Sequence, residues 1–284
     1  MSLAAKGSVV VVMNHLDGSG PVVQTKCGNE VTFDHETPKL PYDQIEEVRK
    51  ANTNFRVQEV ITATEAVMAM DRQDTEELAE SHLSFKNRLQ IDHISVMGHS
   101  FGGATALTAT KRRPDMFKAV IAHEPATGWI PDDARKSFFE GKIQGLELEQ
   151  RLLEKDNVLE GLRDEAKGAK DNSLPEGVDT LVLFSHEWRE KGWGRAHLFE
   201  EIHKQGRLGP EKGVAHFSFI QDAHHNEFSD TCILTPIWLA RSVGATGKRN
   251  PIDTAQEIHN RTISFLLETW TRHGVETTFS LEIR

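Results

Sequence analysis

The stretch of sequence that decides the fold reads IDHISVMGHSFGGA and spans residues 91–104. Residues 91–97 predict a short strand, and a helix is expected from Ala104 until Pro114 stops it. Between them, residues 98–102 match the pattern G-x-S-x-G, which in a strand–turn–helix setting is typical of a nucleophile elbow. The sequence therefore predicts that a tight turn presents Ser100 as a nucleophile.

A tight elbow of this kind requires residues without bulk on both sides of the serine. Gly98, Gly102 and Gly103 are expected to meet that requirement. The turn also directs the backbone N–H of Phe101 and the start of the following helix toward the place where an oxyanion develops. We therefore expect Phe101 to supply an oxyanion donor from its main chain.

Strand-like and helix-like stretches alternate along the rest of the chain. Further strands are expected at residues 8–13, 117–122, 180–184 and 214–220, and further helices at residues 45–67, 197–204 and 254–272. This alternation predicts an α/β fold with a mainly parallel sheet that helices cover on both faces. Thr254 and Glu257 have the spacing of a capping box at the start of the last helix.

One compositional shift interrupts this alternation. Residues 136–170 are rich in charge and carry interspersed leucines, which indicates either a solvated helical excursion or a lid over a site. We predict a single domain over residues 1–284, with a helical insertion or lid at residues 132–175.

Composition narrows the class of protein. The 284 residues contain 33 Lys and Arg against 43 Asp and Glu, and this net charge of −10 disfavours a protein that coats nucleic acid. The longest aliphatic run, residues 9–13, is too short to span a bilayer or to form the core of a signal peptide. Two cysteines, Cys27 and Cys232, form no disulfide framework and fit a reducing compartment. These features leave enzymes and interaction domains of the cytosol.

A serine nucleophile needs a base, and the base needs an acid that orients it. In folds built on this elbow the base follows a late strand, which favours the pair His224 and His225. Two carboxylates compete for the acid: Glu124 follows the strand after the elbow, and Glu187 follows the next one. Position along the chain favours Glu187, because the acid more commonly follows the later strand.

Residues 96–105, VMGHSFGGAT, closely resemble the elbow of the platelet-activating-factor acetylhydrolases. These are calcium-independent serine esterases of the α/β-hydrolase superfamily that release short or oxidised acyl groups from the sn-2 position of phospholipids. The resemblance extends in patches over most of the chain, through residues 3–19, 119–124, 183–187, 223–230 and 252–270.

Carried over residue by residue, the resemblance implies a triad on this chain. Ser100 matches the nucleophile, His225 matches the base, and Glu124 stands where the family has its catalytic Asp. The resemblance thus reverses the positional preference and leaves Glu187 as the alternative acid. The implied mechanism uses no metal and no other cofactor.

The family also places an oxyanion donor in a His-Gly-rich loop, after a strand that precedes the segment matching residues 8–13. No such loop occurs in this sequence. We therefore expect the chain to lack the family's earliest strands and one oxyanion donor, whose loss typically costs about 2.7–4 kcal/mol of transition-state stabilisation. A truncated or non-catalytic binding module with a hydrolase fold is the competing hypothesis.

The expected function is that of a serine esterase or phospholipase that hydrolyses short or oxidised sn-2 acyl esters through an acyl-enzyme. A general carboxylesterase or thioesterase acting on soluble esters is the alternative within enzymes. We expect a cytoplasmic protein with transient contact at membrane surfaces and no nucleic-acid partner, and leave the oligomeric state open. Candidates for the acyl pocket or for contact with lipid are Trp129, Ile130, Phe138, Phe139, Trp188 and Trp193.

Overall fold

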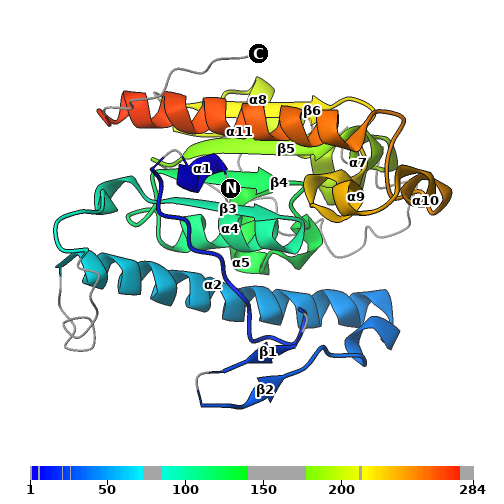
Figure 1. The fold of residues 1–284 in the computed structure, drawn as a ribbon, viewed down its shortest axis with the longest axis horizontal. Coiled ribbons are helices and arrows are strands. Elements are labelled where there is room, and N and C mark those ends of the chain that lie inside the picture. The colour runs from blue at the N-terminus through cyan, green and yellow to red at the C-terminus, as the bar shows by residue number, and fades with distance from the viewer. Residues whose placement is uncertain are drawn as a thin grey trace.

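A sheet of four parallel strands forms the centre of the protein, in the order β3-β4-β5-β6 (Figure 1). The computed structural model describes residues 2–5, 7–20, 22–25, 27–72, 85–139, 177–210 and 213–275. The strands of the sheet are β3 (Ser95–His99), β4 (Ala119–His123), β5 (Asp179–Ser185) and β6 (Ala215–Ile220). A separate antiparallel pair consists of β1 (Val23–Gln24) and β2 (Glu30–Val31).

Helices of very different lengths surround this sheet. The longer ones are α2 (Tyr42–Arg72), α4 (Phe101–Arg112), α5 (Asp132–Phe139), α8 (Ala196–Lys204) and α11 (Pro251–Arg272). The shorter ones are α1 (Ser2–Ala5), α7 (His186–Lys191), α9 (Thr231–Leu234) and α10 (Ile237–Ser242). Single 3-10 turns are η1 (Thr37–Lys39), η2 (Ile91–His93), η3 (Thr127–Trp129), η4 (Trp193–Arg195) and η5 (His225–Phe228).

Alternate residues of the two central strands face opposite sides of the sheet. Ile121 and Leu183 pack in one core with residues of α11, while Val120 and Val182 pack in another with residues of α4, α5 and α8. Helix α2 packs against α4 on the side away from the sheet (Figure 1). Both faces of β4 and β5 are therefore buried, which explains why these strands are continuous apolar runs. The predicted α/β-hydrolase-type sheet, covered by helices on both faces, is confirmed.

Four of the five predicted strands are present, but residues 8–13 form no strand. Val9 is 59% exposed and Val12 is 86% exposed, and no described segment pairs with this run as a strand. The apolar, β-branched residues favour extended backbone. A strand also needs a hydrogen-bonding neighbour, however, and the periodicity of one segment does not reveal whether that neighbour exists.

The predicted ends of other elements need smaller corrections. The side chain of Asn250 accepts a hydrogen bond from the N–H of Ile252, so α11 begins at Pro251 and the capping box predicted at Thr254 and Glu257 is wrong. Of the predicted insertion, α5 covers its start, while residues 140–176 lie outside the described residues. The lid and the single domain therefore stay predictions. Among the helices in the described ranges, none combines the length and apolar character needed to cross a membrane.

Candidate active site

The carboxyl ends of β3 and β4 bring two predicted site residues to the same edge of the sheet. His99 and His123 are partners in the strand register, so Ser100 and Glu124 each follow a paired position. The N–H of Ser100 donates to the carbonyl of His123 at 2.8 Å, and the N–H of Glu124 donates to the carbonyl of Leu183 at 2.8 Å. The main chains of both residues are thus fixed by the parallel sheet itself.

Ser100 has the strained backbone of an elbow, with φ 54° and ψ −111°. Gly98 is required there, because a Cβ at this position would lie 2.1 Å from the main chain of Gly102. Gly103 is also tightly placed, because a Cβ added there would lie 3.0 Å from the Cα of Pro125. At Gly102 itself an added Cβ meets nothing within 4 Å, so the expectation that this residue must lack bulk is wrong. The crowding is between Gly98 and the backbone of Gly102.

This difference gives a matched pair of glycine variants. Gly98→Ala is expected to lower the free energy of unfolding by more than about 3 kcal/mol, because the crowded atoms are main chain and a turn must shift. Gly102→Ala adds its methyl group to open space and should change the free energy of unfolding by no more than about 1 kcal/mol. Urea unfolding measures both. Similar stability of the two variants would contradict the crowding at Gly98.

Glu124 and His225 make a very short contact. Oε2 of Glu124 lies 2.5 Å from Nδ1 of His225, and Oε1 accepts the N–H of Ser185 at 2.8 Å. Burial of the fully enclosed Glu124 raises its pKa, but interactions with His225, His99 and Ser185 outweigh burial and lower the pKa below its usual value. The ionised carboxylate therefore keeps a proton on Nδ1 of His225 and leaves Nε2 free to accept one.

Glu187 contacts the same histidine through the main chain. Its Oε2 accepts the N–H of His225 at 3.0 Å, and its Oε1 binds the ammonium group of Lys191 at 2.7 Å. Glu187 therefore holds the start of η5, whereas Glu124 contacts the imidazole. This geometry favours Glu124 as the orienting acid, against the preference from position along the chain.

Aromatic rings enclose the imidazole of His225. The indole of Trp188 stacks on it with 4.6 Å between ring centroids and 14° between planes, and the ring of His99 lies 4.5 Å away. Trp188 is buried, so its ring packs against the imidazole and does not face lipid. Nε2 of His99 is buried 3.8 Å from Oε2 of Glu124, too far for a hydrogen bond, and finds no hydrogen-bond partner among the described residues. Sequence reasoning did not assign His99 to the site.

Glu227 fixes the loop that carries the base. Its Oε2 accepts the N–H groups of His224 at 2.7 Å and Gly247 at 3.1 Å, and its Oε1 accepts the hydroxyl of Thr246 at 2.8 Å. The side chain is buried, so these bonds tie η5 to the loop before α11. Sequence reasoning missed Glu227, although a glutamate three residues after His224 has the capping-box spacing that signals such a role.

The hydroxyl of Ser100 has no hydrogen-bond partner among the residues that the structure describes. Contacts between nucleophile and base are often long without substrate and shorten in the substrate complex. Phe101 is the first residue of α4, so its N–H has no acceptor within the helix and is available to an oxyanion.

The remaining candidates for a lipid pocket are mostly core residues. Ile130 and Phe138 are fully buried, and Phe139 is 8% exposed. Trp193 is half-exposed, whereas the ring of Trp129 packs edge-on against Phe101 at 4.9 Å. Trp129 thus contacts the elbow, through the residue after Ser100.

One group of described residues also has the spacing of metal ligands. Atoms of His99, Glu124 and His225 lie within 4.8 Å of one another. Two imidazoles and a carboxylate suit zinc, but an ion bound through Nδ1 of His225 and Oε2 of Glu124 would displace the proton in their 2.5 Å contact. The same atoms therefore fit an acid–base pair without rearrangement.

His123 beneath the site gives a prediction for acid stability. Its Nε2 lies 3.1 Å from the hydroxyl of Thr262, and burial, with a contribution from His99, lowers the pKa of His123 to about 3. In the unfolded chain His123 becomes protonated near pH 6.5, whereas in the folded protein it stays neutral at that pH. Stability should therefore fall by about 1.4 kcal/mol per pH unit as the pH drops below 6.5.

Urea unfolding at pH 7, 6 and 5 measures this slope. His123→Gln keeps a hydrogen-bonding side chain but does not titrate, so its slope should be flatter than that of the wild type. His216→Gln, which replaces a half-exposed histidine, is the matched control. A slope that stays equally steep in His123→Gln would contradict a neutral, buried His123.

Comparison with known proteins adds a family assignment to this geometry. A family model described as "Platelet-activating factor acetylhydrolase, isoform II" matches residues 1–174. The matched range covers more than half of the 284 residues and includes Ser100 and Glu124. A search of the curated proteins finds no match.

Proposed function

Because the chain belongs to the platelet-activating factor acetylhydrolase family, we propose that it is a serine esterase that hydrolyses short or oxidised sn-2 acyl esters of phospholipids. The family relationship supports hydrolysis of phospholipid esters as the broad activity. The observation that carries the serine mechanism is the 2.5 Å contact between buried Glu124 and Nδ1 of His225, at the edge of the sheet that carries the strained Ser100.

In this mechanism the Ser100 hydroxyl attacks the ester carbonyl while Nε2 of His225 takes its proton. Glu124 stabilises the imidazolium that results, and the N–H of Phe101 donates to the oxyanion. His225 then gives the proton to the leaving alcohol, which leaves the acyl group on Ser100. A water molecule that His225 deprotonates attacks this acyl-enzyme, and the acid departs as Ser100 regains its proton.

The proposed substrate is a phospholipid or another small ester, and we propose that the protein contacts membrane surfaces transiently. Exposed apolar residues on α9 and α10, soon after the base in sequence, support such contact: Leu234 is 81% exposed and Trp238 is 70% exposed. Tryptophan suits the boundary between water and lipid because its ring is apolar and its N–H is polar. A cytoplasmic location remains part of the proposal, as does the lack of a nucleic-acid partner, which the net charge of −10 supports.

The experiment that tests this function compares ester classes. Purified protein is assayed on phospholipid dispersions with an acetyl group or a long acyl chain at sn-2, and on p-nitrophenyl butyrate, with and without a chelator. We expect faster hydrolysis of the acetyl phospholipid than of the long-chain one, with no effect of the chelator. Hydrolysis of the soluble ester alone would favour the carboxylesterase or thioesterase alternative. Folded protein that hydrolyses none of them and resists fluorophosphonate labelling would favour the binding module.

A further inference from the structure

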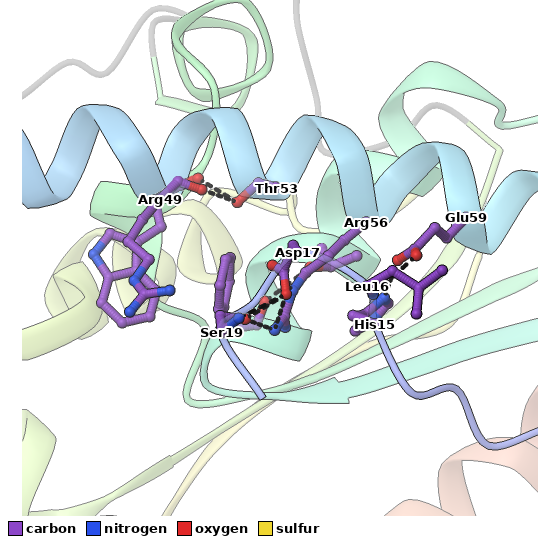
Figure 2. Close-up of polar contacts among 11 residues, drawn as sticks. His15, Leu16, Asp17, Ser19, Arg49, Thr53, Arg56 and Glu59 are labelled. Carbon is purple, nitrogen blue, oxygen red and sulfur yellow. Dashed lines mark hydrogen bonds and ion pairs between the residues drawn. The ribbon is translucent and has the colours of Figure 1, made fainter. Parts of the chain in front are cut away.

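Two arginines of α2 lie beside the residue that follows the nucleophile. The guanidinium of Arg56 is centred 3.7 Å from the ring centroid of Phe101. That of Arg49 lies 5.7 Å from the same ring and 5.6 Å from the ring of Trp129. Figure 2 shows both arginines on the side of α2 that faces residues 15–19. The aromatic rings therefore place two cationic groups next to the elbow.

The charge of Arg56 is balanced within this cluster. Its Nε donates to Oδ2 of Asp17 at 2.6 Å, and its Nη2 donates to the hydroxyl of Ser19 (Figure 2). Oδ1 of Asp17 accepts both the hydroxyl and the N–H of Ser19, at 2.7 and 3.1 Å. Burial raises the pKa of Asp17, but its bonds with Arg56 and Ser19 outweigh burial and lower it. One ionised carboxylate thus balances one guanidinium, and both of its oxygens are occupied.

The guanidinium of Arg49 makes no direct ion pair within the described residues, although Asp17 and Asp34 act on its charge from a distance. The residue is 9% exposed, and its Nη1 is buried without a hydrogen-bond partner within the described part of the chain. In Figure 2 the dashed line at Arg49 joins its main-chain oxygen to the hydroxyl of Thr53, and none reaches the guanidinium. Burial lowers the pKa of Arg49; the negative charges of Asp17 and Asp34 oppose this and the charge of Arg56 adds to it, yet an arginine stays protonated at neutral pH.

Nearby carboxylates are already occupied by other groups. Glu46, one turn earlier on α2, pairs with Lys50 and Arg135. Asp34 accepts hydrogen bonds from residues 36–37 and makes no ion pair with Arg49. A buried cation without a counter-anion costs free energy, and aromatic faces at more than 5 Å compensate only a small part of it. The cluster therefore favours uptake of one anionic group.

We propose that Arg49 binds an anionic oxygen group, a carboxylate or a phosphate, carried by the ester whose carbonyl reacts at Ser100. The proposal rests on the proposed serine esterase function and specifies its substrate class. A guanidinium donates two parallel hydrogen bonds to either group, and none of its donors is used by the described residues. Two parts of a phospholipid ester carry this chemistry: the terminal carboxylate of a truncated, oxidised acyl chain, and the phosphodiester of the headgroup.

Three esters separate these sources from each other. Mono-p-nitrophenyl glutarate carries a carboxylate on the acyl side, a 2-acetyl glycerophosphocholine carries a phosphodiester on the alcohol side, and p-nitrophenyl butyrate is the neutral reference. In Arg49→Leu we expect kcat/KM for one anionic ester to fall at least about tenfold more than for the neutral ester, since a charged hydrogen bond is lost. Arg49→Lys keeps the charge and should recover part of that preference.

The anionic ester that loses its advantage identifies the group that Arg49 binds. An equal fall for all three esters would assign Arg49 to support of the elbow and overturn the proposal, as would the absence of any fall. Arg112→Leu is the matched control, because Arg112 is a partly exposed arginine of α4 that pairs with Asp133. It should keep the wild-type ratio between anionic and neutral esters.

A binding measurement separates this proposal from the serine mechanism. Ser100→Ala protein is titrated calorimetrically with glutarate and with inorganic phosphate, and the titration is repeated with Arg49→Leu added. We expect affinity for one of these anions to fall at least about tenfold in the double variant. Equal binding by both proteins would overturn the anion site even if ester hydrolysis is normal. Arg49-dependent binding by a chain that hydrolyses no ester would retain the anion site and reject the serine esterase.

Discussion

Ser100→Ala is expected to reduce hydrolysis of p-nitrophenyl butyrate by at least about 10⁴-fold, because the acyl-enzyme route depends on this one hydroxyl. Any remaining rate reflects direct attack of water on the bound ester, helped only by substrate binding and by the oxyanion donor. Labelling by an active-site-directed fluorophosphonate should disappear with the activity, since the same oxygen attacks phosphorus.

The structure makes this substitution a clean one. The Ser100 hydroxyl has no hydrogen-bond partner in the described ranges, so alanine removes no internal contact there. Alanine and serine also meet the same strain at φ 54°, so the elbow should persist and the unfolding midpoint should stay near that of the wild type. Ser242→Ala, which replaces an exposed serine of α10, is the control and should retain activity. A Ser100→Ala rate within about tenfold of the wild type would reject the nucleophile assignment.

The elbow could be predicted from sequence because its constraints are local. The backbone of Gly102, four residues further along the chain, crowds Gly98, and the flanking strand and helix have clear patterns. The four paired strands also have clear local sequence patterns. The strand predicted at residues 8–13 is wrong, because strand formation also depends on a neighbour distant in the chain.

The choice between two acids depends on three-dimensional detail that position along the chain does not contain. Glu124 and Glu187 both contact His225, one at the imidazole and the other at the main chain. Position along the chain favours Glu187, which contacts the main chain of His225, and the family resemblance favours Glu124, which contacts its ring. The role of Arg49 could not be predicted from sequence either, because its surroundings come from separate parts of the chain, residues 15–19 and Trp129.

The two carboxylates differ most sharply in the result expected from removing their charge. Glu124→Gln should lower kcat by about 10³- to 10⁴-fold, the range that loss of the orienting acid causes in serine triads. The amide oxygen of the new side chain takes over the bond from the Ser185 N–H, which turns its NH₂ toward Nδ1 of His225. Nδ1 must then accept rather than donate, so Nε2 carries the proton and no longer deprotonates Ser100.

Glu187→Gln is the matched variant, and its kcat should stay within about fivefold of the wild type. Its amide oxygen still accepts the N–H of His225, and the lost partner, Lys191, is half-exposed. Both variants are assayed at pH 7.5. The pKa of Glu124 in the folded protein lies below the usual value of 4.5. The ionised carboxylate therefore stabilises the fold above pH 4.5, and this stabilisation is lost only as the pH falls through the folded pKa. The wild-type carboxylate is thus ionised at the pH of the assay. If only Glu187→Gln loses activity, the short contact between Glu124 and His225 is structural and the acid must be reassigned to Glu187.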